Sequence, residues 1–300
     1  METARPLPAY LALALSMMMV GANVPLGKYL TTQLPIGWIG VVRCGSAVLP
    51  LGILCAWELR RTRLPALRAI AGIAALGISG VFLYPCFLLL GLRTTSAFGA
   101  GAITATLPAI VALLSTLFLH ERFDHRILGA VLCAAFAIAA LELAAAGGAI
   151  ELGSNGNLLV LIAVFAEAVY VILARGLAQA ATPSQMALIA NLSGLAAFAL
   201  LLLVTGEKPP IAPVTAWVGA AAFGITSSVL ALLLWFWAVA RVSASKAGVF
   251  TVFLPLTAAV IAIAILGERP NAWALCGIAA AIIAILLATT SDGSKRLPLP

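Results

Sequence analysis

Charged side chains are scarce in this chain, and their scarcity excludes a water-soluble fold. Charged residues make up 9% of the 300 residues and apolar residues 63%, whereas soluble globular domains carry about 25% charge. The mean hydropathy of +1.15 means that lipid must cover much of the apolar surface. At about 20 apolar residues per helical span, the chain has room for about ten spans and little room for a domain outside the bilayer.

Motifs that would indicate an enzyme, an ATP-driven pump or a metal site are also missing. The sequence contains no G-x-x-x-x-G-K-[ST] loop, no H-E-x-x-H pair and no G-x-S-x-G nucleophile elbow. The five cysteines lack C-x-x-C spacing, so we predict neither disulfides nor a metal site. We expect no cofactor. The net charge of +7 is explained by Lys and Arg in loops, which set membrane orientation, and does not indicate nucleic-acid binding.

Apolar runs separated by charged or Pro- and Gly-rich breaks predict ten transmembrane helices. The first run is too long for a signal-peptide core, and no clear A-x-A cleavage site follows it, so we predict a retained span. With a cytoplasmic N-terminus, most loop Lys and Arg residues fall on the inner side, which predicts that both termini are cytoplasmic. The predicted spans are 8–29, 34–57, 67–90, 96–119, 127–146, 157–178, 185–204, 213–237, 244–266 and 271–290.

An internal repeat relates the two halves of the chain at an offset of 147 residues. Between Ser96 and Arg122, 11 of 27 residues recur without a gap, and both copies read S-A-x-x-A-G-x-x-T-x-x-L-P followed by L-x-E-R. Because five spans are an odd number, the second copy must enter the membrane from the opposite side, as in many secondary transporters. We therefore predict an all-α integral membrane protein of ten transmembrane helices in two inverted five-helix repeats, residues 1–147 and 148–300.

Two prolines lie at matching depths near the middle of the fourth and ninth predicted spans. Pro108 and Pro255 each lack an N–H and clash with the carbonyl four residues earlier, which belongs to Thr104 and to Thr251. We expect a kink at each site that faces protein or a water-filled cavity, because an unsatisfied carbonyl is costly in lipid. The recurrence favours a functional hinge, and the alternative is a bend that serves packing alone.

Strongly polar side chains within spans are few and by default suggest function. Glu167 is a candidate proton carrier, and the alternative is a structural ion pair with Arg43 or an interaction with a helix end. Glu121 with Arg122, and Glu268 with Arg269, directly follow their spans, and we interpret each as a capping and anchoring pair at the membrane interface. Aromatic residues within spans are candidates for the cavity, although packing alone would also explain them. The predicted substrate cavity contains Asn23, Tyr84, Thr104, Glu167, Tyr170, Trp235, Phe250 and Thr251.

The ten predicted spans, the duplicated halves and the L-P then L-x-E-R pattern that ends the fourth span of each half resemble the drug/metabolite transporter superfamily. Each half is similar to one EamA-type domain, and the resemblance covers nearly the whole chain. It implies a bacterial inner-membrane carrier, most often an exporter of amino acids or related metabolites. One subgroup exports aromatic amino acids, and this chain is a candidate for it. Phosphate-carrying relatives would need cationic residues, for which only Arg43 and Lys246 are available.

The expected function is secondary transport of small metabolites, with amino-acid export by alternating access through a cavity between the two repeats. An uncoupled facilitator of small amphipathic solutes is the first alternative, and a membrane enzyme is the second. The expected partners are a small-molecule substrate and the lipid bilayer, with no nucleic acid. The monomer is the candidate functional unit.

Overall fold

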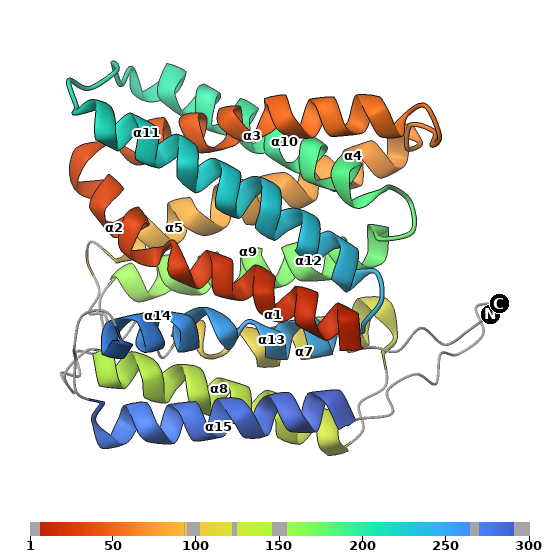
Figure 1. The fold of residues 1–300 in the computed structure, drawn as a ribbon, viewed down its shortest axis with the longest axis vertical. Helices are drawn as coiled ribbons and strands as arrows, with labels where there is room; N and C mark the ends of the chain where they lie inside the picture. The colour runs from red at the N-terminus through yellow and green to blue at the C-terminus, as the bar shows by residue number, and fades with distance from the viewer. Residues whose placement is uncertain are drawn as a thin grey trace.

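The computed structural model describes residues 7–92, 94, 103–121, 125–145, 155–264 and 270–290, and the regular elements in these ranges are helices (Figure 1). The helices of the first half are α1 (Leu7–Ala22), α2 (Val24–Gln33), α3 (Ile36–Glu58), α4 (Leu67–Leu76), the π-helix η1 (Gly77–Leu83), α5 (Tyr84–Gly91), α7 (Leu107–Leu119) and α8 (His125–Ala145). Those of the second half are α9 (Asn155–Leu177), α10 (Pro183–Thr205), α11 (Val214–Phe223), the π-helix η2 (Gly224–Ala231), α12 (Leu232–Val239), α13 (Ala244–Phe250), α14 (Phe253–Ala264) and α15 (Ala272–Thr290).

These helices form the ten predicted spans. Eight of the described helical stretches are long and apolar enough to cross a membrane, and two shorter apolar helices, Leu107–Leu119 and His125–Leu141, supply the fourth and fifth spans. Most bounds agree with the sequence prediction to within two residues. The first span is longer than predicted, because the helix resumes after a turn at Asn23 and continues to Gln33.

The helix bounds repeat at the offset seen in the sequence. Adding 147 to the bounds of α3 and α4 gives the bounds of α10 and α11, and the π-helices begin at the equivalent residues Gly77 and Gly224. π-Helices are rare and usually form short insertions within α-helices. Two of them at equivalent positions therefore support the duplication independently of residue identity.

The equivalent helices α3 and α10 run in opposite directions. Glu58 at the end of α3 accepts a hydrogen bond from the hydroxyl of Thr182, the N-cap residue of α10 (2.9 Å). At the other end, the Trp38 indole donates to the carbonyl of Lys208, just beyond α10 (3.1 Å). This antiparallel arrangement confirms that the repeats are inverted.

Two equivalent glycine contacts hold the halves together. A Cβ added at Gly77 would lie less than 3.0 Å from the carbonyl oxygen of Ala190, and one added at Gly224 would lie equally close to that of Arg43. Ala190 and Arg43 are themselves 147 residues apart. Each contact packs a π-helix of one half against a long helix of the other, η1 against α10 and η2 against α3. The interface between the halves is thus built from two symmetric crossing points.

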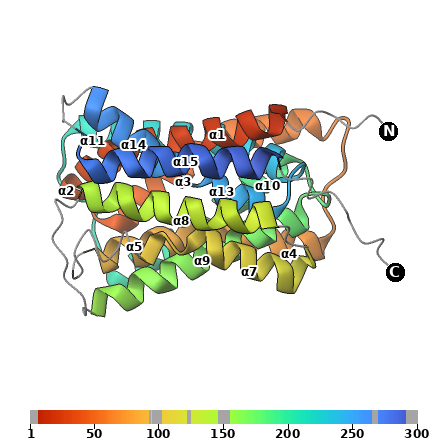
Figure 2. The same cartoon turned by 90° about the horizontal axis from the view of Figure 1, so that it is seen from below.

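The remaining helices surround this interface. Helices α8 and α15 pack side by side at one edge of the bundle, with α3 and α10 at the opposite edge (Figures 1 and 2). The principal apolar core draws on helices of both halves. Leu49, Leu117 and Leu203 are examples of side chains that point outward and are more than half exposed, as expected where lipid surrounds the protein.

Candidate functional site

The fourth and ninth spans are interrupted where the prolines predict. In the ninth span, residues 251–252 form a turn between α13 and α14, and the Thr251 carbonyl accepts from the Leu254 N–H (3.1 Å). In the fourth span, residues 105–106 form a turn before α7, and the Thr106 hydroxyl donates to the Ile103 carbonyl (2.6 Å). The predicted breaks near Pro108 and Pro255 are therefore confirmed. Their use as hinges remains a prediction.

Glu167 occupies the middle of the buried face of α9, close to the centre of the span. It is half-buried, whereas its neighbours on that face are at most 5% exposed: Val160, Ala163, Val164, Tyr170, Val171 and Ala174. Glu167 is thus the least buried member of this face of α9. No hydrogen bond joins the carboxylate to another described residue, so the structural pair with Arg43 is not formed. The Arg43 guanidinium instead donates to the Val81 carbonyl (2.7 Å).

Tyr170 and Trp235 are brought together next to Glu167. Their rings are nearly parallel, with centroids 6.2 Å apart and planes at 16°, and only 5% and 1% of the two residues are exposed. Tyr170 packs against Gly80 of η1, where an added Cβ would overlap the tyrosine ring. The Tyr170 hydroxyl and the Trp235 indole N–H are buried without a hydrogen-bond partner in the described structure. Two polar groups on one short stretch of the interface are therefore unsatisfied.

Phe250 and Lys246 form a second group at the start of the ninth span. Phe250 stacks on Tyr10 of α1, with ring centroids 5.5 Å apart and planes at 14°. Lys246 is 8% exposed, and its ammonium donates to the Tyr10 hydroxyl (3.0 Å). These contacts join α1 of the first half to α13 of the second half. The sequence identified Lys246 and Phe250 but not Tyr10, whose position 236 residues away gives no local signal.

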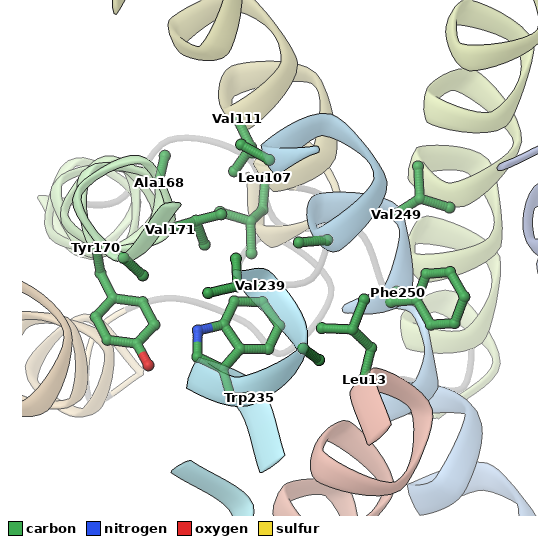
Figure 3. Close-up of a cluster of buried hydrophobic side chains, with 14 of the residues drawn as sticks. Leu13, Leu107, Val111, Ala168, Tyr170, Val171, Trp235, Val239, Val249 and Phe250 are labelled. Atoms are coloured by element: carbon green, nitrogen blue, oxygen red, sulfur yellow. The ribbon is translucent and has the colours of Figure 1, made fainter. Parts of the chain in front are cut away.

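The remaining residues of the predicted cavity lie apart from one another in the structure. The Asn23 amide donates to the Thr226 hydroxyl (2.9 Å), linking the first span to η2. Tyr84 at the start of α5 and Thr104 before α7 are half-buried, and the hydroxyl of the buried Thr251 donates to the Gly248 carbonyl (2.7 Å). Apolar side chains, including Leu13, pack between Trp235 and Phe250 (Figure 3). That these residues line a substrate cavity remains a prediction.

Glu121 joins the two halves at one end of the bundle. One carboxylate oxygen accepts from the Ala244 N–H (2.8 Å), and the other accepts from the N–H and the hydroxyl of Ser245 (3.2 and 2.9 Å). A carboxylate is favourable at a helix N-terminus, where backbone N–H groups lack helical partners. Glu121 therefore caps α13, a helix of the opposite half, and not the span that it follows, and its predicted partner Arg122 lies outside the described residues. Glu268 lies outside the described residues.

Glu58 makes a similar connection between the two halves at the same end of the bundle. Its carboxylate accepts hydrogen bonds from the hydroxyls of Thr182 and Ser184 at the start of α10. We refer to the contacts of Glu58 with α10 and of Glu121 with α13 as the two glutamate clamps. The Glu58 clamp was not predicted from the sequence, although Thr182 and Gln185 have the spacing of a capping box. A hollow of about 520 Å³ beside this clamp is lined in part by Glu58, Ser184 and Trp237.

Comparisons with known proteins agree with this architecture. The model of the EamA-like transporter family matches residues 7–142 and again residues 154–290. The uncharacterized transporter YetK of Bacillus subtilis is 28% identical over 270 residues, which span 87% of this chain and 80% of YetK. A protein of Streptantibioticus cattleyicolor named "probable terminal-alkyne amino-acid exporter" is 27% identical over 258 residues, 86% of this chain and 83% of that protein.

A solved crystal structure has the same fold. It superposes with a TM-score of 0.76 at 20% identity and covers 93% of this chain and 96% of the other. The fold, the duplicated match to the family model and the relatives named as transporters indicate a transporter rather than an enzyme. Because the family model matches nearly the whole of both halves, the chain belongs to the EamA-like transporter family, within the drug/metabolite transporter superfamily.

Proposed function

We propose that this transporter exports amino acids by alternating access through a site between its two halves. The observation that carries the proposal is the pair of broken spans at equivalent positions, with the accessible Glu167 in mid-span between buried neighbours. Interrupted helices at a repeat interface are typical of substrate sites in secondary transporters. The relative named as an amino-acid exporter supports this substrate class, with aromatic or other apolar amino acids as first candidates.

In the proposed mechanism, the described state is closed at the end that carries the two glutamate clamps. Helix α1 begins and α15 ends at this same end of the bundle (Figure 1), so cytoplasmic termini would make it the cytoplasmic end. Opening it requires the carboxylates of Glu58 and Glu121 to leave the helices of the second half. The spans containing Pro108 and Pro255 would bend at their breaks while the halves rock about the Gly77 and Gly224 contacts.

This proposal includes the predicted organisation of the molecule. Residues 1–147 and 148–300 form the two repeats, and the monomer contains the complete site. The bacterial inner membrane is the expected location, with both termini in the cytoplasm. The proposed cavity contains the residues predicted from the sequence, with Glu167, Tyr170 and Trp235 as its central group.

Transport by the purified protein tests the proposal. Proteoliposomes are offered a panel of radiolabelled amino acids, with and without an imposed pH gradient, and wild type is compared with Glu167→Gln. Glu207→Gln is the matched control, because Glu207 is exposed. We expect saturable uptake that the gradient drives in wild type and in the control but not in Glu167→Gln.

The other outcomes separate the alternatives. Saturable uptake that responds neither to the gradient nor to Glu167→Gln would indicate a facilitator. If wild type takes up none of the amino acids, the proposed substrate class is wrong.

A further inference from the structure

We propose that Tyr170 and Trp235 form the subsite that binds the carboxylate of the transported amino acid, with the substrate ammonium directed at Glu167. This inference rests on the proposed function and identifies the chemistry of its site. It assigns one end of the substrate to a pair of neutral hydrogen-bond donors on α9 and α12.

The first argument is that two buried donors lack acceptors. The Tyr170 hydroxyl and the Trp235 N–H have no hydrogen-bond partner in the described structure. A buried donor without a partner destabilises a protein by about 1–3 kcal/mol, and native structures contain few of them. Two such donors on neighbouring membrane-spanning helices indicate that another state of the protein supplies the acceptor.

The second argument concerns the type of ligand. An indole N–H can only donate, so the group that satisfies Trp235 must be an acceptor. Figure 3 shows the Trp235 nitrogen on the edge of its ring that faces Tyr170, and the two rings are nearly parallel. A carboxylate has two oxygens and can accept from both donors at once.

The third argument is electrostatic and selects a zwitterion. The Glu167 carboxylate lies one helical turn before Tyr170 and interacts electrostatically with its hydroxyl. In its ionised form Glu167 would repel a simple anion at this position and attract the ammonium of an amino acid. The printed hydrogen bonds of the nearby cations go elsewhere, from Arg43 to the Val81 carbonyl and from Lys246 to the Tyr10 hydroxyl. The group therefore suits an amino acid better than a phosphate ester.

The fourth argument concerns access. Glu167 is half-buried, while the two donor atoms are covered. In the proposed mechanism substrate approaches from the side of Glu167, and a shift of α12 relative to α9 uncovers the donors. Such a shift is expected in alternating access, where one half rocks against the other.

Removing single polar atoms tests the subsite. Tyr170→Phe and Trp235→Phe each delete one donor and retain an aromatic ring, and the controls Tyr29→Phe and Trp273→Phe make the same changes at exposed positions. Uptake of the amino acid that wild type transports fastest is measured in proteoliposomes. We expect KM to rise about tenfold in each site variant, the value of one hydrogen bond to a charged group, and to stay at the wild-type value in both controls.

A second measurement separates carboxylate recognition from general damage. The competitor is the amine that corresponds to the transported amino acid without its carboxylate. We expect this amine to inhibit wild type about tenfold more weakly than the amino acid does. The difference should shrink in each site variant. In the absence of substrate, Tyr170→Phe should be at least as thermostable as wild type, because it loses a buried unpaired hydroxyl and keeps the ring.

The outcomes distinguish this inference from the proposed function. If wild type transports amino acids and the site variants keep the wild-type KM and the same preference for amino acid over amine, the subsite is wrong and the export function stands. If KM rises without any loss of that preference, Tyr170 and Trp235 do not bind the carboxylate, and the inference is likewise overturned. If wild type transports no amino acid, both proposals fail.

Discussion

The hydrogen bonds of Glu121 allow an estimate of how much the clamp stabilises the closed state over the open state. Glu121→Ala removes three hydrogen bonds from the start of α13, two from backbone N–H groups and one from the Ser245 hydroxyl. If these contacts form only when this end is closed, their loss destabilises the closed state and leaves the open state unchanged. We therefore expect Glu121→Ala to shift the population toward the open state.

The size of the shift follows from the contacts. Replacing a capping side chain by Ala costs about 0.5–2 kcal/mol, and a hydrogen bond to a charged group contributes about 1.5–3 kcal/mol. Glu121 is half-buried, so solvent weakens its contacts, and about 3 kcal/mol is a reasonable value for the whole clamp. A free-energy change of this size corresponds to about a hundredfold change in the open-to-closed ratio.

Alkylation of Cys55 measures this shift. Cys55 is 4% exposed and lies one turn before Glu58, at the clamped end of α3. With the other four cysteines replaced by alanine, a membrane-impermeant maleimide added on the side of the membrane that the clamped end faces reports opening of this end. We expect the labelling rate to rise by up to about a hundredfold in Glu121→Ala. Glu121→Gln retains one acceptor oxygen and should give a smaller rise.

Two controls decide whether the reasoning holds. Glu207→Ala removes an exposed carboxylate near the other end of α10 and should leave Cys55 labelling unchanged. Thermal unfolding in detergent checks that the variants remain folded at the labelling temperature. A folded Glu121→Ala protein that labels at the parent rate would show that the clamp does not hold this end closed.

Three further predictions concern the backbone. Gly77→Ala and Gly224→Ala should each lower stability by about 1–3 kcal/mol, because the added Cβ meets backbone of the opposite half. At Gly52 the added Cβ has free space, so Gly52→Ala should be neutral or slightly stabilising. Thermal unfolding checks all three variants. Pro108→Ala should slow transport more than it lowers the melting temperature, and an unchanged transport rate would contradict the hinge. His120→Gly should raise stability by about 1 kcal/mol, because His120 has a positive φ of 53°; a lower melting temperature would contradict this.

Hydropathy and repetition in the sequence determined the membrane architecture. Lipid selects apolar helical runs of nearly constant length, so the span predicted at 185–204 differs by only two residues from α10 at its start and by one at its end. The shared register and the odd number of spans per repeat predicted the inversion. The positions of the breaks also followed from sequence, because Pro108 and Pro255 cannot supply the N–H that a continuous helix needs.

Only the tertiary structure decided which side chains meet across the interface. Glu121 pairs with the start of α13, 123 residues further along the chain, and Tyr170 pairs with Trp235 on another span. Sequence identifies such residues as polar or aromatic within a span, but their partners depend on how the two halves dock. Docking is set by close packing at Gly77 and Gly224, and a pattern of hydropathy carries no information about the rotation of one helix against another.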